Sequence, residues 1–522
     1  MAYISSASQV FANESKMKSY PISGKERFSL PVRGVLICFS SRMRRSLASF
    51  PKLVLVIVWF LLVSSISFSQ TAGAAPSVSL PGAQSPFQGS APEGAATSEV
   101  LQIDFKDAID RGLRNNLGLL LAGDQAQAAS GQRWQALSEL LPNVSVHAVE
   151  SAQTQSLTAL GFKSNVFPFP VPRVIGPFNY FDLRASAAQS VFNYRSLERE
   201  RAASQNAKAA QLSIKDAREL VVLAVGNSYL QAIAAAARVE TTEAQVKSAQ
   251  ALYQKTADAQ KAGLAPAIDA LRSQVELQAR QEQLIVARNQ LAKSQLTVAR
   301  VIGLPPGQQF VLTEKAPYKA LTPLALETYL QRAYAGRADY QSALARLAGA
   351  ELGRKAAVAG RYPSIDIDAS FGDIGVTPAH SNGTWQVMGG ISIPVFAGNR
   401  VHGDILVADA QLKQARQQLG DLRGRIDYEV RSALLDLNAA SEQVEVARSS
   451  VDLAEQALAQ SQDRFSAGVA DNLEVVQAQE SVAAAHETYI QSLYAHNLAK
   501  VELAYVIGDA EQGVRRYLKG IQ

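Results

Sequence analysis

The amino-acid sequence predicts an α+β membrane protein in which one helix–strand–strand–long-helix unit occurs twice. Three observations support this prediction. Short motifs return about 205 residues further along the chain, apolar and polar residues alternate in four short segments, and two long stretches contain no proline. Alternation with a period of two is typical of half-buried strands, and proline-free segments rich in alanine and leucine favour helices.

The N-terminal segment has the pattern of an export signal. Residues 53–68 form an uncharged apolar run that is preceded by basic residues and followed by small ones. This arrangement is typical of a bacterial secretory signal, here with cleavage near Ala74. An uncleaved membrane anchor is the alternative. The true start site is left open between Met1, Met17 and Met43.

The basic charge of the chain is concentrated in this predicted signal. The 522 residues include 51 Lys and Arg against 46 Asp and Glu, a formal charge of +5. Nine of the basic and two of the acidic residues lie in residues 1–75, so the remainder has a net charge of −2. The single cysteine, Cys38, would leave with the signal, so the mature chain could form no disulfide. The positive charge therefore gives no reason to expect nucleic-acid binding.

Paired motifs divide the rest of the chain into two similar halves. Val-Ile-Gly ends at Gly303 and again at Gly508, and Ala-Gly ends at Gly263 and again at Gly468. A repeat of this length indicates a duplicated half rather than a solenoid. The expected boundaries are a targeting segment at 1–75, a flexible linker at 76–100, a first repeat at 101–310 and a second repeat at 311–522.

Each half should begin with a helix and continue with two strands. Asp104 is the expected N-cap in the first half, and Thr322, with Pro323 at the first helical position, in the second. In every expected strand one face is apolar and the other is polar or small. The four expected strands span residues 143–150, 181–191, 364–371 and 385–395.

Very long helices should follow the strands, from about 194 to 261 and from 400 to 466. Each would extend on the order of 100 Å. Both contain apolar residues every seven positions, a spacing that indicates helices packed side by side as in coiled coils. Each would reverse at a glycine turn and return as a second helix. The seven-residue seams are Val225, Ala232, Val239, Val246 and Tyr253 in the first half, and Val430, Leu437, Val444, Val451, Leu458 and Phe465 in the second.

Four amphipathic strands pose a physical problem in a membrane. An open sheet in lipid would leave edge N–H and C=O groups unpaired, and four strands are too few to close around a lumen. Three chains would supply twelve strands, with the polar face inward as in a porin. Asp366 and Asp368 alternate onto that polar face. We expect them to line the barrel lumen, with an external loop edge as the alternative.

Several motifs, taken together and in order, resemble those of the TolC-like outer-membrane efflux proteins over nearly all of residues 101–510. The matching segments are IDFKDAIDRGLRNN at 103–116, SVFNYRS at 190–196, KAGLAPAIDALRSQ at 261–274, IPVFAGNR at 393–400 and RFSAGVADNLEVVQAQ at 464–479.

The resemblance implies a homotrimer with a twelve-stranded β-barrel in the outer membrane and an α-helical coiled-coil barrel across the periplasm. It also implies two partners, a periplasmic adaptor protein and an inner-membrane pump of the resistance-nodulation or ABC type. The protein would then be the passive exit duct of a tripartite efflux or type I secretion system, opened by docking. Selectivity for the cargo would lie largely in the pump.

The resemblance places the two helix reversals at the periplasmic tip. Gly263, Leu264, Gly468 and Val469 would then contact the adaptor. A simpler interpretation is that both glycines only permit a tight reversal of the chain. The two interpretations are compatible.

The resemblance also suggests a pore constriction near these turns. Asp269 and Glu474 stand six residues after the turn glycines, where the family has an acid. Three copies of each would form negative rings that favour cations, and the alternative is an ordinary solvated helix carboxylate. The chain departs from well-known members with Phe465 for a tyrosine, Ala470 for an arginine and Gln477 for a second acid. Closure of the pore would therefore depend on packing around Phe465 and on the acid rings.

Other functions find less support in the sequence. The five histidines are scattered, and no glycine-rich phosphate loop is present, so no catalytic residue, metal ligand or cofactor is expected. The resemblance places the connection at 153–180 outside the cell, where it could narrow the mouth or serve as a receptor surface. A proline-stiffened loop without a dedicated role is the alternative. A periplasmic coiled-coil scaffold or adhesin on an uncleaved anchor is the alternative function, but a scaffold would not need the four strands.

Overall fold

The computed structural model describes residues 85–92, 94–161, 172–314, 318–321 and 324–519. The chain divides into two units, residues 1–79 and 80–522, and everything described below lies in the second. The predicted export signal with Cys38, the first part of the linker and the proline-rich centre of the 153–180 connection lie outside the described residues.

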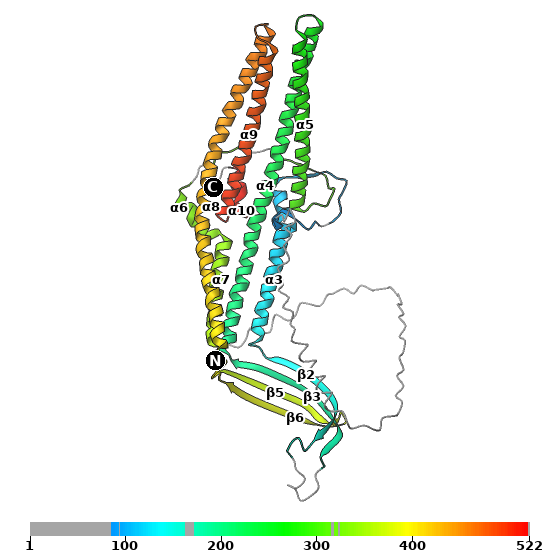
Figure 1. The fold of residues 1–522 in the computed structure, drawn as a ribbon, viewed down its shortest axis with the longest axis vertical. Helices are drawn as coiled ribbons and strands as arrows, with labels where there is room; N and C mark the ends of the chain where they lie inside the picture. The colour runs from blue at the N-terminus through cyan, green and yellow to red at the C-terminus, as the bar shows by residue number, and fades with distance from the viewer. Residues whose placement is uncertain (1–84, 93, 162–171, 315–317, 322–323, 520–522) are drawn as a thin grey trace, which may run out of the picture. The chain divides into compact units, whose positions relative to one another are not determined.

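One order of elements occurs twice along the described chain (Figure 1). A short strand, two helices, two long strands, a very long helix and a returning helix follow one another in each half. A 3₁₀ turn, η1 (Pro86–Gln88), precedes the first half. The first half contains β1 (Leu101–Ile103), α2 (Phe105–Asn115), α3 (Leu117–Ser138), β2 (Asn143–Ser156), β3 (Val174–Phe192), α4 (Tyr194–Lys261) and α5 (Ala267–Ile302). The second contains β4 (Phe310–Leu312), α6 (Leu326–Gly336), α7 (Ala338–Ala359), β5 (Ser364–Thr377), β6 (His380–Ser392), α8 (Arg400–Ser466), α9 (Asn472–Val506) and a final α10 (Ala510–Leu518).

The long helices start where predicted, at Tyr194 and Arg400, but the first helix of each half starts as predicted only in the first half. Asp104 caps α2, because its Oδ1 accepts a hydrogen bond of 2.6 Å from the backbone N–H of Asp107. A second cap, Asn116, then begins α3, so the single expected helix is two helices. The predicted start at Pro323 is wrong. Helix α6 begins at Leu326 because Ala325, at the N-cap, is extended, and Thr322 and Pro323 lie outside the described residues.

The four long strands form one antiparallel sheet in the order β2-β3-β5-β6. The register pairs Val144 with Ala187 and Phe371 with Trp385, which puts the predicted apolar positions on one face. Most strands extend beyond their predicted ends, but β6 stops at Ser392. The prediction that it runs to Val395 is wrong, because Pro394 has no N–H to donate to a strand ladder.

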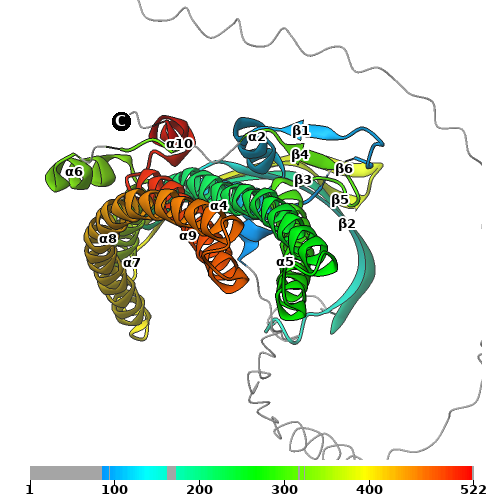
Figure 2. The ribbon, with the colours of Figure 1, turned by 90° about the horizontal axis from the view of Figure 1, so that it is seen from above.

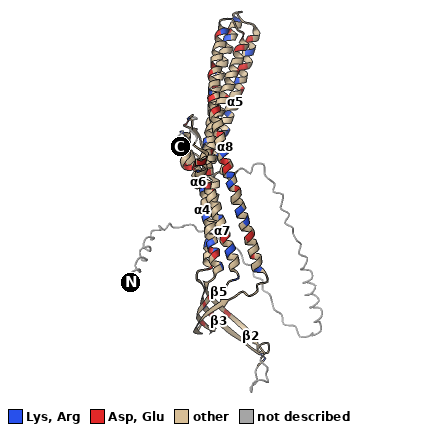
Figure 3. Ribbon diagram, turned by 90° about the vertical axis from the view of Figure 1, so that its left-hand side faces the viewer, with Lys and Arg blue, Asp and Glu red and all other residues tan. Residues whose placement is uncertain are grey.

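The apolar face of this sheet is exposed in the single chain. Trp385 and Phe371 are 76% and 70% exposed. Figure 3 shows charged residues along the helices and a sheet that is mostly uncharged. A soluble protein would not leave large apolar side chains side by side in water, so this face suits lipid. Further apolar residues exposed on the same face are Val144, Val146, Leu183, Ile365, Ile367, Val387 and Ile391.

The two long helices extend away from the sheet, and shorter helices pack along them. Nearer the sheet the neighbours pack in the order α3, α4, α7, α8, and further away in the order α5, α4, α9, α8. Viewed from above, the outer four helices form a curved row (Figure 2). The predicted ends of α4 and α8, at 261 and 466, are confirmed.

The seven-residue seams are buried most fully near the middle of the long helices. Val225, Val430 and Val444 are completely buried, whereas Val246 and Leu458, nearer the turns, are only half-buried. The main hydrophobic core lies where α2, α4, α9 and α10 meet. Its large members include Ile103, Tyr229, Ile302, Ile426, Leu503 and Tyr517.

Candidate functional site

The polar face of the sheet is hollowed and lined by small polar side chains. Asp366 accepts a hydrogen bond of 3.2 Å from Ser364 Oγ, and Asp368 is exposed on the same face. The lining of a channel by these two carboxylates stays a prediction. The hollow is lined mainly by Asn143, Ser145, Ser186, Asp368, Ser370 and Gln386.

The same polar face contains an ion pair that the sequence analysis missed. Arg184 donates from Nε to Asp182 Oδ1 at 2.7 Å, and Tyr180 donates from its hydroxyl to Asp182 Oδ2 at 3.2 Å. Opposite charges two residues apart in a strand share a face. That spacing was the signal from which the pair could have been predicted.

The two helix reversals have the same geometry. Gly263 and Gly468 both have φ of 72°, a left-handed conformation that favours glycine. Leu264 N–H donates to Ala259 O, and Val469 N–H donates to Arg464 O, which closes both turns in the same way. Leu264 and Val469 are 83% and 70% exposed. The turn role of both glycines is confirmed, and both turns lie at the end of the helices furthest from the sheet (Figure 1).

Asp269 and Glu474 lie in the first turns of the two returning helices, and each has a cation of its own chain beside it. Glu474 Oε1 is 3.1 Å from Arg464 Nε, and Asp269 Oδ1 is 3.8 Å from Arg272 Nη1. The negative charge at these positions is therefore partly balanced within one chain, which the predicted acid rings did not include.

Two further contacts join the hairpins close to the turns. The ammonium of Lys255 on α4 lies 5.4 Å from the ring centroid of Phe465 on α8, a cation–π contact. Asn472 at the start of α9 donates from Nδ2 to the carbonyl oxygen of Asp269 at 2.9 Å. The structure thus brings Phe465, Asp269 and Glu474 to one region. Gln477 is exposed on α9, and its side chain makes no polar contact with the described residues.

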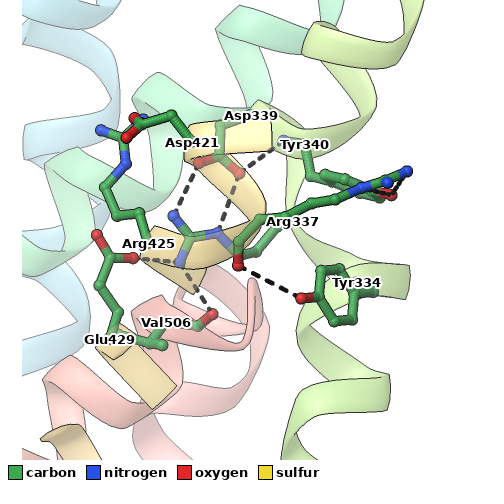
Figure 4. Close-up of polar contacts among 9 residues, drawn as sticks. Tyr334, Arg337, Asp339, Tyr340, Asp421, Arg425, Glu429 and Val506 are labelled. Atoms are coloured by element: carbon green, nitrogen blue, oxygen red, sulfur yellow. Dashed lines mark hydrogen bonds and ion pairs between the residues drawn. The ribbon is translucent and has the colours of Figure 1, made fainter. Parts of the chain in front are cut away.

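A buried arginine holds several elements together midway along the helices (Figure 4). Arg337, 5% exposed, donates to both carboxylate oxygens of Asp339, at 3.0 and 2.8 Å. It also donates to Glu429 of α8 and, at 3.4 Å, to the carbonyl of Val506 at the end of α9. Nearby on α4, burial and, after it, the negative charge of the neighbouring Asp339 raise the pKa of Asp216 to about 6.

A second titratable group on α4 holds the last helix. The carboxylate of Glu219 accepts hydrogen bonds from the backbone N–H groups of Ala510 and Glu511 at the start of α10. Burial nevertheless raises the pKa of Glu219 to about 7. Arg218 beside it pairs with Glu511. In the described part of the chain, no three His, Cys, Asp or Glu side chains are grouped so that they could hold a metal ion.

An exposed apolar sheet face joined to long paired helices defines an outer-membrane channel protein. The chain belongs to the outer membrane efflux protein family, whose model matches residues 108–304 and 329–509. The protein is therefore an outer-membrane efflux channel, and the location predicted from the sequence is confirmed.

Curated relatives with similar sequences are known from Pseudomonas putida. The pyoverdine export outer membrane protein OpmQ is 24% identical over 350 residues, which cover 64% of this chain and 71% of the relative. The toluene efflux pump outer membrane protein TtgC is 26% identical over 352 residues, which cover 62% and 68%.

Solved structures share the fold. The outer membrane protein VceC from Vibrio cholerae superposes with a TM-score of 0.67 at 20% identity, covering 77% of this chain and 96% of that one. The outer-membrane channel CmeC from Campylobacter jejuni gives a TM-score of 0.69 at 15% identity, covering 86% and 98%.

Proposed function

We propose that three copies of this chain form the passive exit duct of a tripartite efflux or type I secretion system. The twelve strands of the trimer would close a β-barrel, and the helices would continue it as a coiled-coil barrel across the periplasm. The two halves of each chain, at 101–310 and 311–522, would derive from one duplicated unit, which follows the export signal at 1–75 and the linker at 76–100.

The observation that best supports closure is the pair of open sheet edges. Among the described residues, β2 and β6 each have a strand on one side only. Because β2 leaves the helices and β6 returns to them, the β6 edge of one copy can pair antiparallel with the β2 edge of the next. Closure removes the edges, whose unpaired backbone groups would each cost several kcal/mol in lipid.

Exposed apolar rows on the outermost helices support the same assembly. On α5, Val275 and Val286 are 66% and 62% exposed, and on α8, Val446 and Leu453 are 68% and 63% exposed. Each pair is spaced by seven or eleven residues, so its members lie on one side of the helix. Since α5 and α8 stand at opposite ends of the row, α8 of one copy would pack against α5 of the next.

The turns would be the docking end of the duct. A periplasmic adaptor protein would contact Gly263, Leu264, Gly468 and Val469. This adaptor would join the duct to an inner-membrane pump of the resistance-nodulation or ABC type. The pump supplies the energy. The names of the two Pseudomonas relatives specify different cargoes, pyoverdine and toluene, which fits a duct whose selectivity lies in its pump.

The pore would be narrowest beside the two helix reversals, and the closed sheet would enclose a water-filled lumen. The constriction would be formed by Asp269, Glu474, Phe465 and Gln477. It would be kept closed by packing around Phe465 and by the acid rings. Asp366 and Asp368 would line the barrel. The scaffold or adhesin considered from the sequence has no use for a sheet with one lipid-suited face.

A matched pair of substitutions in β6 tests the barrel. Val387→Lys places a charge on the apolar face, where a lysine at the bilayer midplane costs about 2–4 kcal/mol, whereas Gln386→Lys places it on the polar face. We expect only Val387→Lys to reduce the trimer band in unboiled electrophoresis of outer-membrane fractions. Equal effects of both substitutions, or a wild-type chain that runs as a soluble monomer, would overturn the proposal.

A further inference from the structure

The two passages from strand to long helix differ in this chain. After β3, Asn193 caps α4 directly, accepting a hydrogen bond from Ser196 N–H. After β6, residues 393–399 intervene before Arg400 begins α8, and Gly398 and Asn399 both adopt positive φ. The second passage is therefore a loop, although both contain the dipeptide Val-Phe.

This loop exposes its apolar side chains. Val395 and Phe396, 92% and 84% exposed, are the two most exposed large apolar residues in the described part of the chain. Val191 and Phe192, at the equivalent place in the first passage, are 57% and 48% exposed. Two adjacent apolar side chains with this exposure are unfavourable in water. They therefore indicate a contact with something outside the single chain.

Unpaired cations lie beside the loop. Arg361 follows the end of α7 and Arg400 begins α8, and these segments touch, since a Cβ at Gly360 would lie 3.5 Å from Val401 Cγ1. Both arginines are exposed and neither has an ion-pair partner among the described residues. By contrast Arg195, at the same passage in the first half, pairs with Asp404 at 2.9 Å.

We propose that the interfacial patch, defined as Arg361, Tyr362, Val395, Phe396 and Arg400, anchors the channel in the periplasmic leaflet of the outer membrane by binding phospholipid. Val395 and Phe396 insert among the upper acyl chains, and the two guanidinium groups bind lipid phosphate. The inference rests on the outer-membrane location of the sheet and not on the number of copies.

The position of the patch favours lipid as its occupant. Val395 and Phe396 follow Ile391, which lies on the apolar face of β6, and precede Arg400, where α8 begins. Charged residues are frequent along the helices and rare in the sheet (Figure 3). Tryptophan and tyrosine are enriched at the interface between lipid and water. Arginine offers planar paired donors that match phosphate oxygens. Tyr362, 51% exposed and 5.8 Å from the ring of Tyr194, adds an amphipathic side chain of the kind found there.

A neighbouring copy is the rival occupant, because β6 is an edge strand and would lie beside β2 of the next copy. The connection that leads into β2 contains one acid, Glu139, which lies 3.6 Å from Arg199 of its own chain. That acid is therefore already engaged and offers little to Arg361 and Arg400.

Depth-dependent fluorescence quenching distinguishes the two occupants. A Phe396→Cys variant, in a Cys38→Ser background that leaves no other cysteine, is labelled with NBD and reconstituted as the full assembly in phosphatidylethanolamine–phosphatidylglycerol vesicles. Phe371→Cys on the apolar sheet face and Ser466→Cys at the exposed tip are the controls. Nitroxide lipids labelled at carbon 5 or carbon 12, and a water-soluble nickel chelate, are the quenchers.

We expect the label at 396 to be quenched at least about twofold more by the carbon-5 lipid than by the carbon-12 lipid. The label at 371 should show deeper quenching, and the label at 466 should respond to nickel alone. Quenching at 396 by nickel alone would show a solvated loop, and protection from all quenchers would show burial between copies. Either result overturns the proposal.

The phosphate contact has its own test. Replacing both Arg361 and Arg400 with glutamine should at least halve the phospholipid that the purified channel retains in native mass spectrometry. Arg416→Gln on α8, an exposed arginine with an ion-pair partner in Glu351, is the matched control. Equal lipid retention in the double variant and the control would remove the arginines from the proposed site.

Discussion

Asn472, whose side chain is completely buried, donates a hydrogen bond from Nδ2 to the backbone carbonyl oxygen of Asp269, 2.9 Å away. This contact joins the first turn of α9 to the first turn of α5. The two residues are 203 positions apart in the sequence and lie on different hairpins, close to both helix reversals. In the proposed duct, a widening that moved the two hairpins of one chain apart would break this bond.

Replacing Asn472 with alanine should loosen this end of the channel. A buried hydrogen bond lost in this way costs about 1–3 kcal/mol. We expect a higher mean single-channel conductance in planar bilayers, with insertion unchanged. Asn289→Ala, at an exposed position on α5, is the control. Identical conductance in both variants would show that the bond does not hold the tip closed.

The acid positions should set ion selectivity together with their arginine neighbours. Removing Glu474 leaves Arg464 without its partner, and removing Asp269 does the same to Arg272. Alanine at either acid should therefore shift the reversal potential in a KCl gradient toward anions and change the conductance. Arg464→Gln should shift it toward cations. Gln477→Ala, a neutral change nearby, should leave it unchanged, and unaltered potentials in all variants would exclude the acid rings.

Stability should depend on pH through Asp216. Its folded pKa of about 6 lies above the ordinary value of 3.8, so the folded state binds the proton more tightly than the unfolded state. The free energy of unfolding therefore falls as the pH rises from about 4 to 6. The charged groups facing Asp216 are Arg337 at the N-cap of α7, Asp339 and Arg346 on α7, and Glu429 on α8.

The Asp216→Asn variant should weaken this dependence and leave the part that Glu219 contributes through its raised pKa of about 7. At pH 7 it should raise the free energy of unfolding by up to about 3 kcal/mol per chain. Guanidinium unfolding across pH 4 to 8 measures the effect. Asp452→Asn, at an exposed position on α8, is the control. A variant that keeps the wild-type slope between pH 4 and 6 would contradict the assignment.

Arg337 should matter far more to stability than a surface arginine. Arg337→Met leaves the carboxylates of Asp339 and Glu429 without their buried cation, which costs about 3–5 kcal/mol. Arg416→Met breaks an exposed pair with Glu351 and should cost less than about 1 kcal/mol. Denaturation midpoints of the two variants should differ accordingly. Similar midpoints would mean that packing of the methionine side chain can replace the buried ion pairs of Arg337.

The sequence predicted local elements well and distant contacts poorly. The ends of α4 and α8 were predictable because their alanine-rich, proline-free sequences have strong helix propensity and end at glycine turns. The parallel pairing of β1 with β4 and the docking of α10 were not, because three-residue strands and a nine-residue helix carry little periodicity.

The candidate site shows the same difference between local features, which the sequence predicts, and distant contacts, which it does not. Positions six residues after a turn glycine could be read from the sequence, and the structure places Asp269 and Glu474 near one another. The contacts of Asn472 with Asp269 and of Lys255 with Phe465 depend on how the two hairpins face one another, which no local pattern encodes. Arg337 likewise contacts Glu429 and Val506, which are brought together only by tertiary packing.

In the proposed trimer, the open edges of β2 and β6 would also determine how assembly proceeds. Three separate copies have six open edges, a pair and a single copy together have four, and a closed ring of three has none. The first association therefore pairs two edges, whereas the last one pairs four. Because the closing step removes twice as many unpaired edges as the first step, assembly should be cooperative and dependent on chain concentration.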